Sequence, residues 1–576
     1  MQLLINQIGY STAANKQGVL LSPYALPLET VDNLDVIIVD TATKQEVARI
    51  PLQPGSQVDQ WNIGWSYPFD FSKLNKSGTY QARFEDCSSH SFKIQPQLLF
   101  KRTFSDLLHY FKSQRCSGIY DQADQQAKLL GSERTIDVSG GWYDASGDVS
   151  KYLSHLSYAN YMNPQQIPML VWNLLSSLDK LKGEPSCHSF TQARLIDEAL
   201  FGADFLVRMQ DVEGFFYMTV FDQWSKDPAQ RDICAYKTQA GIKLDSYHAG
   251  FRQGAGVAIA ALASAARLKQ SGEFSNSAYL QQAELGYWHL IEHNQNYLDD
   301  GTENIIDEYC ALLASIELYK TTSEPRYLDE SRSWTKKLIA RQSSDDYCHN
   351  FWSANSDGSR PYFHAAEAGL PVIALCCFLD IETDIEIRSQ VVDIINASLL
   401  FELSITQKVA NPFGYPRQYV KDVSGEKRDA FFIAQDNESA YWWQGENARL
   451  ASLTAMAHFA LPYLSGHLVP QVQNYAQQSL NWILGLNPYD MCMLDGHGHN
   501  NPDYLPELGF FNAKGGICNG ITAAFDNPLG IGFKPAEYAN NLEQNWRWGE
   551  QWLPHAAWYL LAIAYQTSDE LSGDSQ

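Results

Sequence analysis

The chain has 576 residues, of which 45% are hydrophobic and 13% aromatic. This is the composition of a globular protein too long for one hydrophobic core, so at least two domains are expected. Acidic residues number 66 against 42 basic ones, for a net charge of -24, which excludes the basic footprint of a nucleic-acid-binding protein and disfavours anionic membrane surfaces. No uninterrupted run of about 18 apolar residues predicts a membrane span.

The first ten residues contain no basic region followed by a long apolar stretch, so they do not resemble a signal peptide. Ten cysteines are scattered between Cys87 and Cys518 without a Cys-x-x-Cys pair. We interpret them as mostly buried free thiols in a reducing compartment. Together these features predict a cytoplasmic protein.

Residues 1–97 predict a β-sandwich. Short apolar runs at 18–21, 35–39 and 80–84 are separated by turn-forming residues such as those at 75–78. Several short strands with turns at this spacing are typical of a sandwich.

From about residue 98 the pattern becomes helical. Residues 194–210 place apolar side chains along one helical face. Six later segments show the same spacing: 254–268, 308–319, 366–378, 449–463, 472–484 and 552–565. Many are rich in Ala and Gly, which lets helices pack closely, and the remaining length accommodates about a dozen helices. A closed double ring would be one way to pack them, which periodicity alone does not establish.

The segment 140–148 sets Asp144 and Asp148 four residues apart among glycines, Trp142 and Tyr143. Glycine lets the backbone turn tightly and approach a ligand. Aromatic faces suit the apolar face of a sugar, and paired carboxylates can hold and deprotonate a water. The alternative is an Asx-turn or a helix cap. The segment favours a hydrolase that acts on carbohydrate.

Glu550 lies among Trp546, Trp548 and Trp552, just before an apolar helix. A carboxyl group among indoles is poorly solvated, and desolvation raises its pKa, as a general acid requires. The alternative is a glutamate in a first helical turn, favoured by the helix dipole.

Further candidate substrate-binding residues lie in polar, aromatic segments. The segment 435–447 offers Glu438, Trp443 and Asn447 as a sugar subsite, or as a loop packed on the next helix. His248 and Arg252, and separately His364, stand where apolar helices open. There a capping or structural role competes with ligand contact.

His497 and His499 are two residues apart in the segment 495–502. This spacing can bind a metal, but no third ligand is evident in the sequence. Hydrogen bonding to substrate is therefore favoured, with a His-rich surface turn as the alternative. No metal or cofactor is expected.

Taken together, these segments resemble glycoside hydrolase family 9. The segment 140–148 is similar to the family's Gly-Gly-Trp-Tyr-Asp-Ala-Gly-Asp loop, and Glu550 to its late Asn-Glu motif before the last apolar helix. Further similar segments are 6–10, 111–116, 203–206 and 481–488. The resemblance implies an immunoglobulin-like sandwich over 1–97 and an (α/α)6-barrel catalytic domain over 98–576.

The resemblance also implies hydrolysis with inversion at the anomeric carbon. By position, Asp148 is the base, Asp144 orients the water and Glu550 is the acid. The chain departs from the family pattern, because Ser146 adds a residue between the aspartates and leaves Asp144 as an alternative base. Gly549 stands where the family has Asn. The family's Pro-His-His-Arg segment is absent as such.

The chain resembles the family's intracellular subgroup of exo-acting β-glucosaminidases and β-glucosidases. The implied substrate is a small β-1,4-linked oligosaccharide, cut from its non-reducing end. A glucosamine ammonium group would require a nearby carboxylate, from Asp144, Asp148 or the Asp436/Glu438 pair. The alternatives are an endo-β-1,4-glucanase, a non-catalytic oligosaccharide-binding protein, and a metal-dependent hydrolase that uses His497 and His499.

Overall fold

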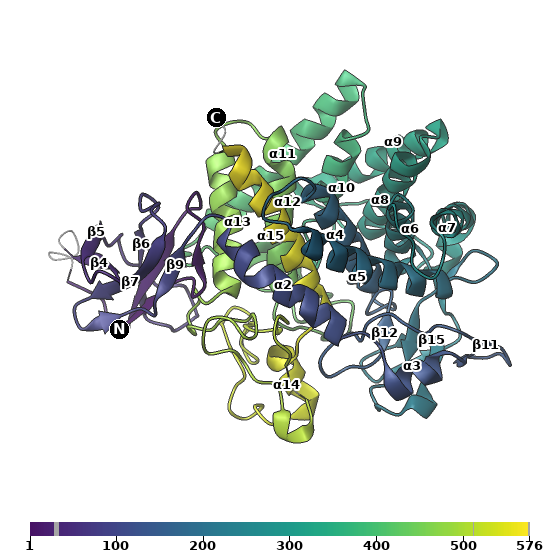
Figure 1. Cartoon of the computed structure of the whole chain (residues 1–576), viewed down its shortest axis with the longest axis horizontal. Coiled ribbons are helices and arrows are strands. Elements are labelled where there is room, and N and C mark those ends of the chain that lie inside the picture. The colour runs from purple at the N-terminus through teal and green to yellow at the C-terminus, as the bar shows by residue number, and fades with distance from the viewer. Residues whose placement is uncertain (28–33, 511, 574–576) are drawn as a thin grey trace.

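The computed structural model describes residues 1–27, 34–510 and 512–573. A small β-sandwich at the N-terminus lies beside a larger helical barrel (Figure 1). In this part of the chain, every helix is too short or too polar to cross a lipid bilayer. The ten cysteines are all free thiols, nine of them buried and Cys87 half-buried, as the sequence predicts.

Two sheets form the sandwich. One has the antiparallel order β1 (Gln2–Leu4), β3 (Gln17–Ser22), β6 (Trp65–Asp70). The other has the order β2 (Gly9–Tyr10), β9 (Phe92–Ile94), β7 (Gly78–Phe84), β4 (Asp35–Asp40), β5 (Glu46–Pro51), with β8 (Cys87–Ser88) paired to β7. Alternate residues such as Tyr80, Ala82 and Phe84 point into a shared core. The strands predicted at 18–21, 35–39 and 80–84 fall within β3, β4 and β7.

Six helices form a closed inner ring: α4 (Ile167–Lys180), α6 (Ala255–Ala265), α8 (Ile305–Thr322), α10 (Leu370–Leu379), α12 (Asn447–Ala460) and α15 (Leu553–Gly573). Each contacts the next, and α15 returns to α4. Six more pack around them: α2 (Leu98–Ser113), α5 (Ser189–Arg208), α7 (Asn276–Tyr297), α9 (Pro325–Ile339), α11 (Ile385–Gln407) and α13 (Val469–Ile483). The double ring is therefore confirmed as an (α/α)6 barrel.

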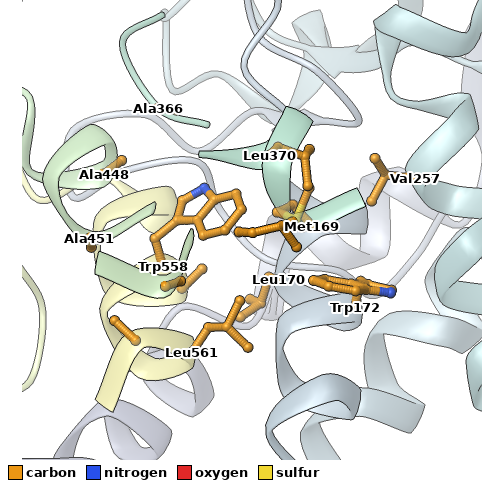
Figure 2. Packing of buried hydrophobic residues seen from close by; sticks show 14 of the residues in the cluster. Met169, Leu170, Trp172, Val257, Ala366, Leu370, Ala448, Ala451, Trp558 and Leu561 are labelled. Carbon is orange, nitrogen blue, oxygen red and sulfur yellow. The ribbon is translucent and has the colours of Figure 1, made fainter. Parts of the chain in front are cut away.

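Two of the inner helices, α6 and α10, are apolar on nearly every side because they are enclosed on every side. All residues of α6 and α10 are buried, as expected for helices inside a large core. Figure 2 shows Trp558 and Leu561 of α15 packed near Met169 of α4 and Leu370 of α10. This packing fills the barrel's interior with apolar side chains.

A sheet that the sequence did not predict is inserted between the helices. Its order is β11 (Thr135–Ile136), β10 (Ala127–Leu129), β15 (Asp232–Lys237), β14 (Thr219–Phe221), β12 (Lys151–Tyr152), with β16 (Ile242–Leu244) paired to β15. Most of these strands have two or three residues, too few to show alternation. The segment 140–148 leads directly into β12.

The remaining elements are small. Three strand pairs connect helices: β13 (Phe216–Tyr217) with β17 (His248–Ala249), β18 (Gln342–Ser343) with β19 (Phe351–Trp352), and β20 (Gln418–Lys421) with β21 (Lys427–Ala430). Two short helices, α3 (Gly118–Asp124) and α14 (Leu542–Gly549), lie among the loops at one end of the barrel (Figure 1).

Candidate active site

The segment 140–148 lies against the chain that joins α14 to α15. Ala145 forms a β-bridge with Trp552, and the Ser146 N–H donates to the Gln551 carbonyl at 2.9 Å. These main-chain contacts join segments about 400 residues apart in the sequence. They place Glu550 beside the loop that carries Asp144 and Asp148.

Buried Lys151, Asp124 and Arg231 form an ion cluster that contacts the backbone of the segment 140–148 and the residues just before it. Lys151 on β12 donates from Nζ to the carbonyls of Val138 and Gly140, at 2.6 and 2.8 Å. The same ammonium lies 2.7 Å from Asp124 Oδ2. Arg231 donates to both oxygens of Asp124, at 2.6 and 2.8 Å. These contacts fix the backbone that carries Asp144 and Asp148.

Asp148 accepts three hydrogen bonds. The Ser150 N–H lies 2.8 Å from Oδ1, and Oδ2 accepts from the Tyr152 hydroxyl at 2.7 Å and the Trp224 indole N–H at 3.1 Å. Burial and the neighbouring charge of Asp222 raise the pKa of Asp148. The three donors oppose this shift because they stabilise the ionised form.

Asp144 accepts fewer hydrogen bonds than Asp148 does. Its Oδ1 accepts from the Trp552 indole N–H at 3.1 Å, and its Oδ2 lies 3.9 Å from His155 Nδ1. Burial, followed by the charges of Asp148 and Glu550, raises the pKa of Asp144 well above its usual value. Burial also lowers the pKa of His155 to about 3, so this imidazole is neutral at pH 7.

Glu550 has the electrostatic setting of a general acid. Its Oε1 accepts from the Gly147 N–H at 3.1 Å. Burial, followed by the charge of Asp148, raises the pKa of Glu550 to about 8. The carboxyl is therefore protonated at neutral pH. The contact requires glycine, because a Cβ on Gly147 would lie 2.4 Å from Oε1.

Aromatic side chains adjoin the carboxyl groups. Trp442 packs edge-on against Trp552 with centroids 6.1 Å apart and stacks on Trp546 at 6.3 Å. Trp546 is half-buried and Trp224 is 37% exposed, so both retain surface that a sugar can contact. Trp546 therefore keeps surface for the predicted sugar contact, whereas Trp552 is 3% exposed and donates its indole N–H to Asp144, so its structural partner is that carboxyl group.

Two predicted tryptophans do not reach a sugar. Trp142 has no exposed surface, and its indole N–H donates to Glu198 at 3.3 Å. Trp443 is 1% exposed and packs against Trp548. We therefore assign both to the core and not to a subsite, because stacking requires a free ring face.

Three other candidates have structural partners. Tyr143 exchanges hydrogen bonds with the main chain of Ser117. The Asn447 amide donates to the Cys518 carbonyl at 2.8 Å, and His364 Nδ1 accepts the N–H of Glu367 at 3.1 Å. These contacts correct the predicted substrate-binding roles of Asn447 and His364, since both side chains are buried.

Two charged candidates are held in ion pairs. Buried Arg252 binds Asp300 at 2.7 Å and Asp307 at 3.2 Å. Glu438 accepts from Arg360 Nη2 at 2.7 Å. Arg252 is therefore a structural residue, and the charge of Glu438 is already matched.

The three remaining histidine candidates have their partners away from Asp144, Asp148 and Glu550. His248 stacks on Tyr297 with centroids 5.0 Å apart. His497 Nε2 is 2.9 Å from Asp106 on α2. His499 lies beside His90 of the sandwich. None of the three has a contact that joins it to the site within the described residues.

Sequence reasoning missed Tyr152, Trp224 and His155. Trp224 belongs to a loop in which Gln223, Trp224 and Lys226 all have φ of 57–58°. Non-glycine residues rarely adopt this left-handed conformation, and such strain clusters at functional sites. No sequence pattern signals it, because the loop contains no glycine at these positions.

Two family models match the chain. The model for glycosyl hydrolase family 9 matches residues 100–507, and that for the cellulase N-terminal ig-like domain matches residues 1–89. The chain belongs to glycoside hydrolase family 9. Glu550 lies beyond the matched range, so its place in this glycoside hydrolase's site rests on the contacts described above.

Solved structures of the family share the fold. A metagenome-derived family 9 endoglucanase is 19% identical, with a TM-score of 0.65 and coverage of 98% of this chain and 99% of that one. A family 9 protein of Bacteroides ovatus is also 19% identical, with a TM-score of 0.65 and 99% coverage of both chains. A variant endoglucanase of Alicyclobacillus acidocaldarius is 16% identical, with a TM-score of 0.66 and coverage of 98% and 99%. Among curated protein sequences, none matches this chain.

Proposed function

We propose that this family 9 glycoside hydrolase cleaves β-1,4-linked glucosamine, or glucose, from the non-reducing end of short oligosaccharides with inversion. The main support for this proposal is that the carboxyl group of Glu550, protonated at neutral pH, lies against the loop that holds Asp144 and Asp148. Gly147 donates to Glu550 from the loop that holds Asp144 and Asp148, and the pKa of Glu550 is about 8.

In the proposed reaction, Asp148 accepts a proton from a water whose oxygen attacks the anomeric carbon. The bond from that carbon to the glycosidic oxygen breaks, and Glu550 protonates the departing oxygen. Inversion follows because the water enters opposite the leaving group, which requires carboxyl groups about 6.5–9.5 Å apart. The three donors to Asp148 favour it over Asp144 as the base. Asp144 then orients the water.

The crowding of acidic groups supports a preference for an amino sugar. Asp148 raises the pKa of both Asp144 and Glu550, Glu550 adds to that of Asp144, and Asp222 raises that of Asp148. An ammonium group at the sugar's 2-position would relieve this repulsion through charge-assisted hydrogen bonds. With Glu438 paired to Arg360, Asp144 and Asp148 are the carboxylates we propose for that contact.

The supporting contacts for the sugar ring come from Trp546, which we retain as a substrate-binding residue, together with Trp224. We also propose a cytoplasmic location, supported by the nine buried thiols. The second candidate is an endoglucanase, since two of the similar solved structures carry that name.

Product analysis distinguishes these functions. Wild type and Glu550→Gln are incubated with glucosamine dimer, cellobiose and soluble cellulose, and the released sugars and their first-formed anomer are measured. We expect monosaccharide release from the dimers, fastest from the glucosamine dimer, with the α-anomer formed first. Equal or faster turnover of cellobiose would overturn the glucosamine preference. Loss of cellulose viscosity with little monosaccharide would favour the endoglucanase, and binding without hydrolysis would refute both.

A further inference from the structure

Three metal-binding side chains meet where the sandwich adjoins the barrel. His90 follows β8 in the sandwich, whereas Asp490 and His499 lie in the loop after α13. One potential ligand atom from each residue lies within 4.8 Å of the other two. The cluster is distinct from the candidate active site and independent of the function proposed above.

The two imidazoles are unusually close for groups without a shared partner. The ring centroids of His90 and His499 are 3.4 Å apart, with an angle of 36° between the planes. Two protonated rings at this distance would repel each other.

A buried nitrogen at this cluster lacks a partner. His499 Nε2 makes no hydrogen bond to any described residue. It lies 3.6 Å from Asp490 Oδ1, beyond ordinary hydrogen-bond distance. A buried polar atom left unpaired costs about 1–3 kcal/mol. A cation between these two atoms would give His499 Nε2 the partner that it lacks.

The loop around His499 is already fixed in shape. The His499 N–H donates to Gln7 Oε1 at 2.8 Å, and the Cys492 N–H donates to the His499 carbonyl at 3.2 Å. The Gln7 amide also donates to Asp490 Oδ1 at 2.9 Å. One sandwich residue therefore orients two of the three candidate ligands, as supporting groups do around metal sites.

We propose that His90, Asp490 and His499 bind a zinc ion that links the sandwich to the barrel. Two imidazoles and one carboxylate form a ligand set that zinc favours, whereas calcium and magnesium require mainly oxygen ligands. In a tetrahedral zinc site, neighbouring ligand atoms lie roughly 3.3 Å apart. The ligand atoms here lie within 4.8 Å of one another, so they must move closer together to bind the ion. The side chain of His90 is exposed and can make this movement, and a water molecule supplies the fourth ligand.

The sequence pattern pointed to a different pair. His497 and His499 have suitable spacing, but His497 binds Asp106 instead. The partners of His499 come from distant positions that only the fold brings together. The inferred role is structural, because the ligands belong to two domains and none of them contacts the carboxyl groups of the candidate active site within the described chain.

Zinc binding is tested on the full chain after removal of metals. Wild type, His90→Ala and the control His467→Ala are titrated with Zn2+ by calorimetry, and thermal midpoints are recorded with and without the ion. His467 is exposed and lies before α13. The His467→Ala variant therefore shows the effect of removing a surface histidine that is not part of the proposed zinc site. Binding of Co2+, followed by its visible absorption bands, reports the coordination.

We expect one equivalent of Zn2+ in wild type and in His467→Ala, with a raised thermal midpoint in both. The affinity should fall more than tenfold in His90→Ala, which should lose the thermal shift and the four-coordinate Co2+ spectrum. Equal zinc affinity in His90→Ala and wild type, or no stoichiometric binding in wild type, would overturn the proposal. Because hydrolysis is not measured, failure here leaves the proposed function unaffected.

Discussion

Protonation at the single-residue scale depends on how many donors each carboxyl receives. Asp148 has three donors that stabilise its negative charge, Asp144 accepts one indole hydrogen bond, and Glu550 accepts one backbone N–H. Since burial raises the pKa of all three, the number of donors separates an ionised base from a protonated acid. Pairs of groups with diverging environments are typical of acid and base catalysis.

Replacing the proposed acid and base should stop turnover without unfolding the protein. Glu550→Gln removes the transferable proton and Asp148→Asn removes the base, so we expect kcat to fall at least 100-fold in each. Circular dichroism and thermal melting check that the fold is retained. If Asp144→Asn loses more activity than Asp148→Asn, Asp144 is the base. Near-normal activity in Glu550→Gln would remove its assigned role.

Trp224 should set the acidic limb of the pH profile. Trp224→Phe removes the N–H that stabilises ionised Asp148 but keeps a ring beside Phe221. The pKa of Asp148 should rise, and because the base must be ionised, the acidic limb of kcat/KM should move to higher pH. The alkaline limb, assigned to Glu550 with its pKa of about 8, should stay in place. An unchanged acidic limb would show that Asp148 is not the titrating base.

On the scale of structural elements, the site depends on two loops that fit closely. The segment 140–148 rests on the ion cluster of Asp124, Lys151 and Arg231, and its far side touches the chain after α14. A change at the contact with Glu550 should therefore mainly affect catalysis, and a change in the ion cluster should mainly affect stability.

Gly147→Ala should impair activity more than stability. The added Cβ would lie 2.4 Å from Glu550 Oε1, so the acid must move, and we expect kcat to fall more than tenfold. Gly466→Ala is the matched control, because a Cβ there meets no atom within 4 Å. Kinetics and melting curves of both variants provide the comparison. Full activity in Gly147→Ala would mean that Glu550 does not act from this position.

Asp124→Ala should be severely destabilising. It leaves the buried cations of Lys151 and Arg231 without their carboxylate, a change that typically costs about 3–5 kcal/mol. The exposed pair of Glu46 with Arg49 offers a control, since Glu46→Ala should cost below about 1 kcal/mol. Denaturant unfolding measures both. Similar free energies of unfolding for the two variants would contradict a supporting role for the cluster.

At the scale of the whole molecule, buried titratable groups predict how stability depends on pH. The pKa of Glu550 and of Glu367 is raised to about 8, mainly by burial. An unfolded glutamate releases its proton near 4.5. The native state thus binds more protons between these values, so its stability should fall as the pH rises through this range, by about 1.4 kcal/mol per pH unit for each group.

Buried histidines act in the opposite direction. Burial lowers the pKa of His155, His364 and His555 to about 3, whereas the unfolded residues bind protons near 6.5. Their contribution to stability is therefore lost as the pH falls below 6.5. Between pH 4.5 and 6.5 the three histidines outweigh the two glutamates, so stability should be greatest near pH 6.5 and fall on both sides.

Thermal midpoints measured from pH 3.5 to 9 check this prediction. Glu550→Gln is the matched variant, since it cannot titrate and should lose less stability above pH 6.5 than wild type does. A steady rise in stability from pH 4.5 to 9 would contradict the assignment of neutral buried carboxyl groups.

Local sequence was sufficient for the elements with long, regular patterns. The strands at 18–21, 35–39 and 80–84 and the seven predicted helices were recognisable because their apolar residues recur at a fixed spacing. The catalytic candidates were also recognisable, since carboxyls beside glycine and tryptophan are rare combinations. Trp142 and Trp443 show the limit of this reasoning. An indole in the core and one in a subsite have the same local sequence.

The sequence by itself therefore indicated the two-domain organisation and the helix-rich second domain, and it singled out three carboxyl groups as catalytic candidates, because each inference depends on residues close together in the chain. Only the tertiary structure decided which groups meet. The ring closes when α15 reaches α4, Glu550 approaches Gly147 across 403 residues, and His90 reaches His499 from another domain. Such contacts depend on packing between distant segments, which no local spacing encodes.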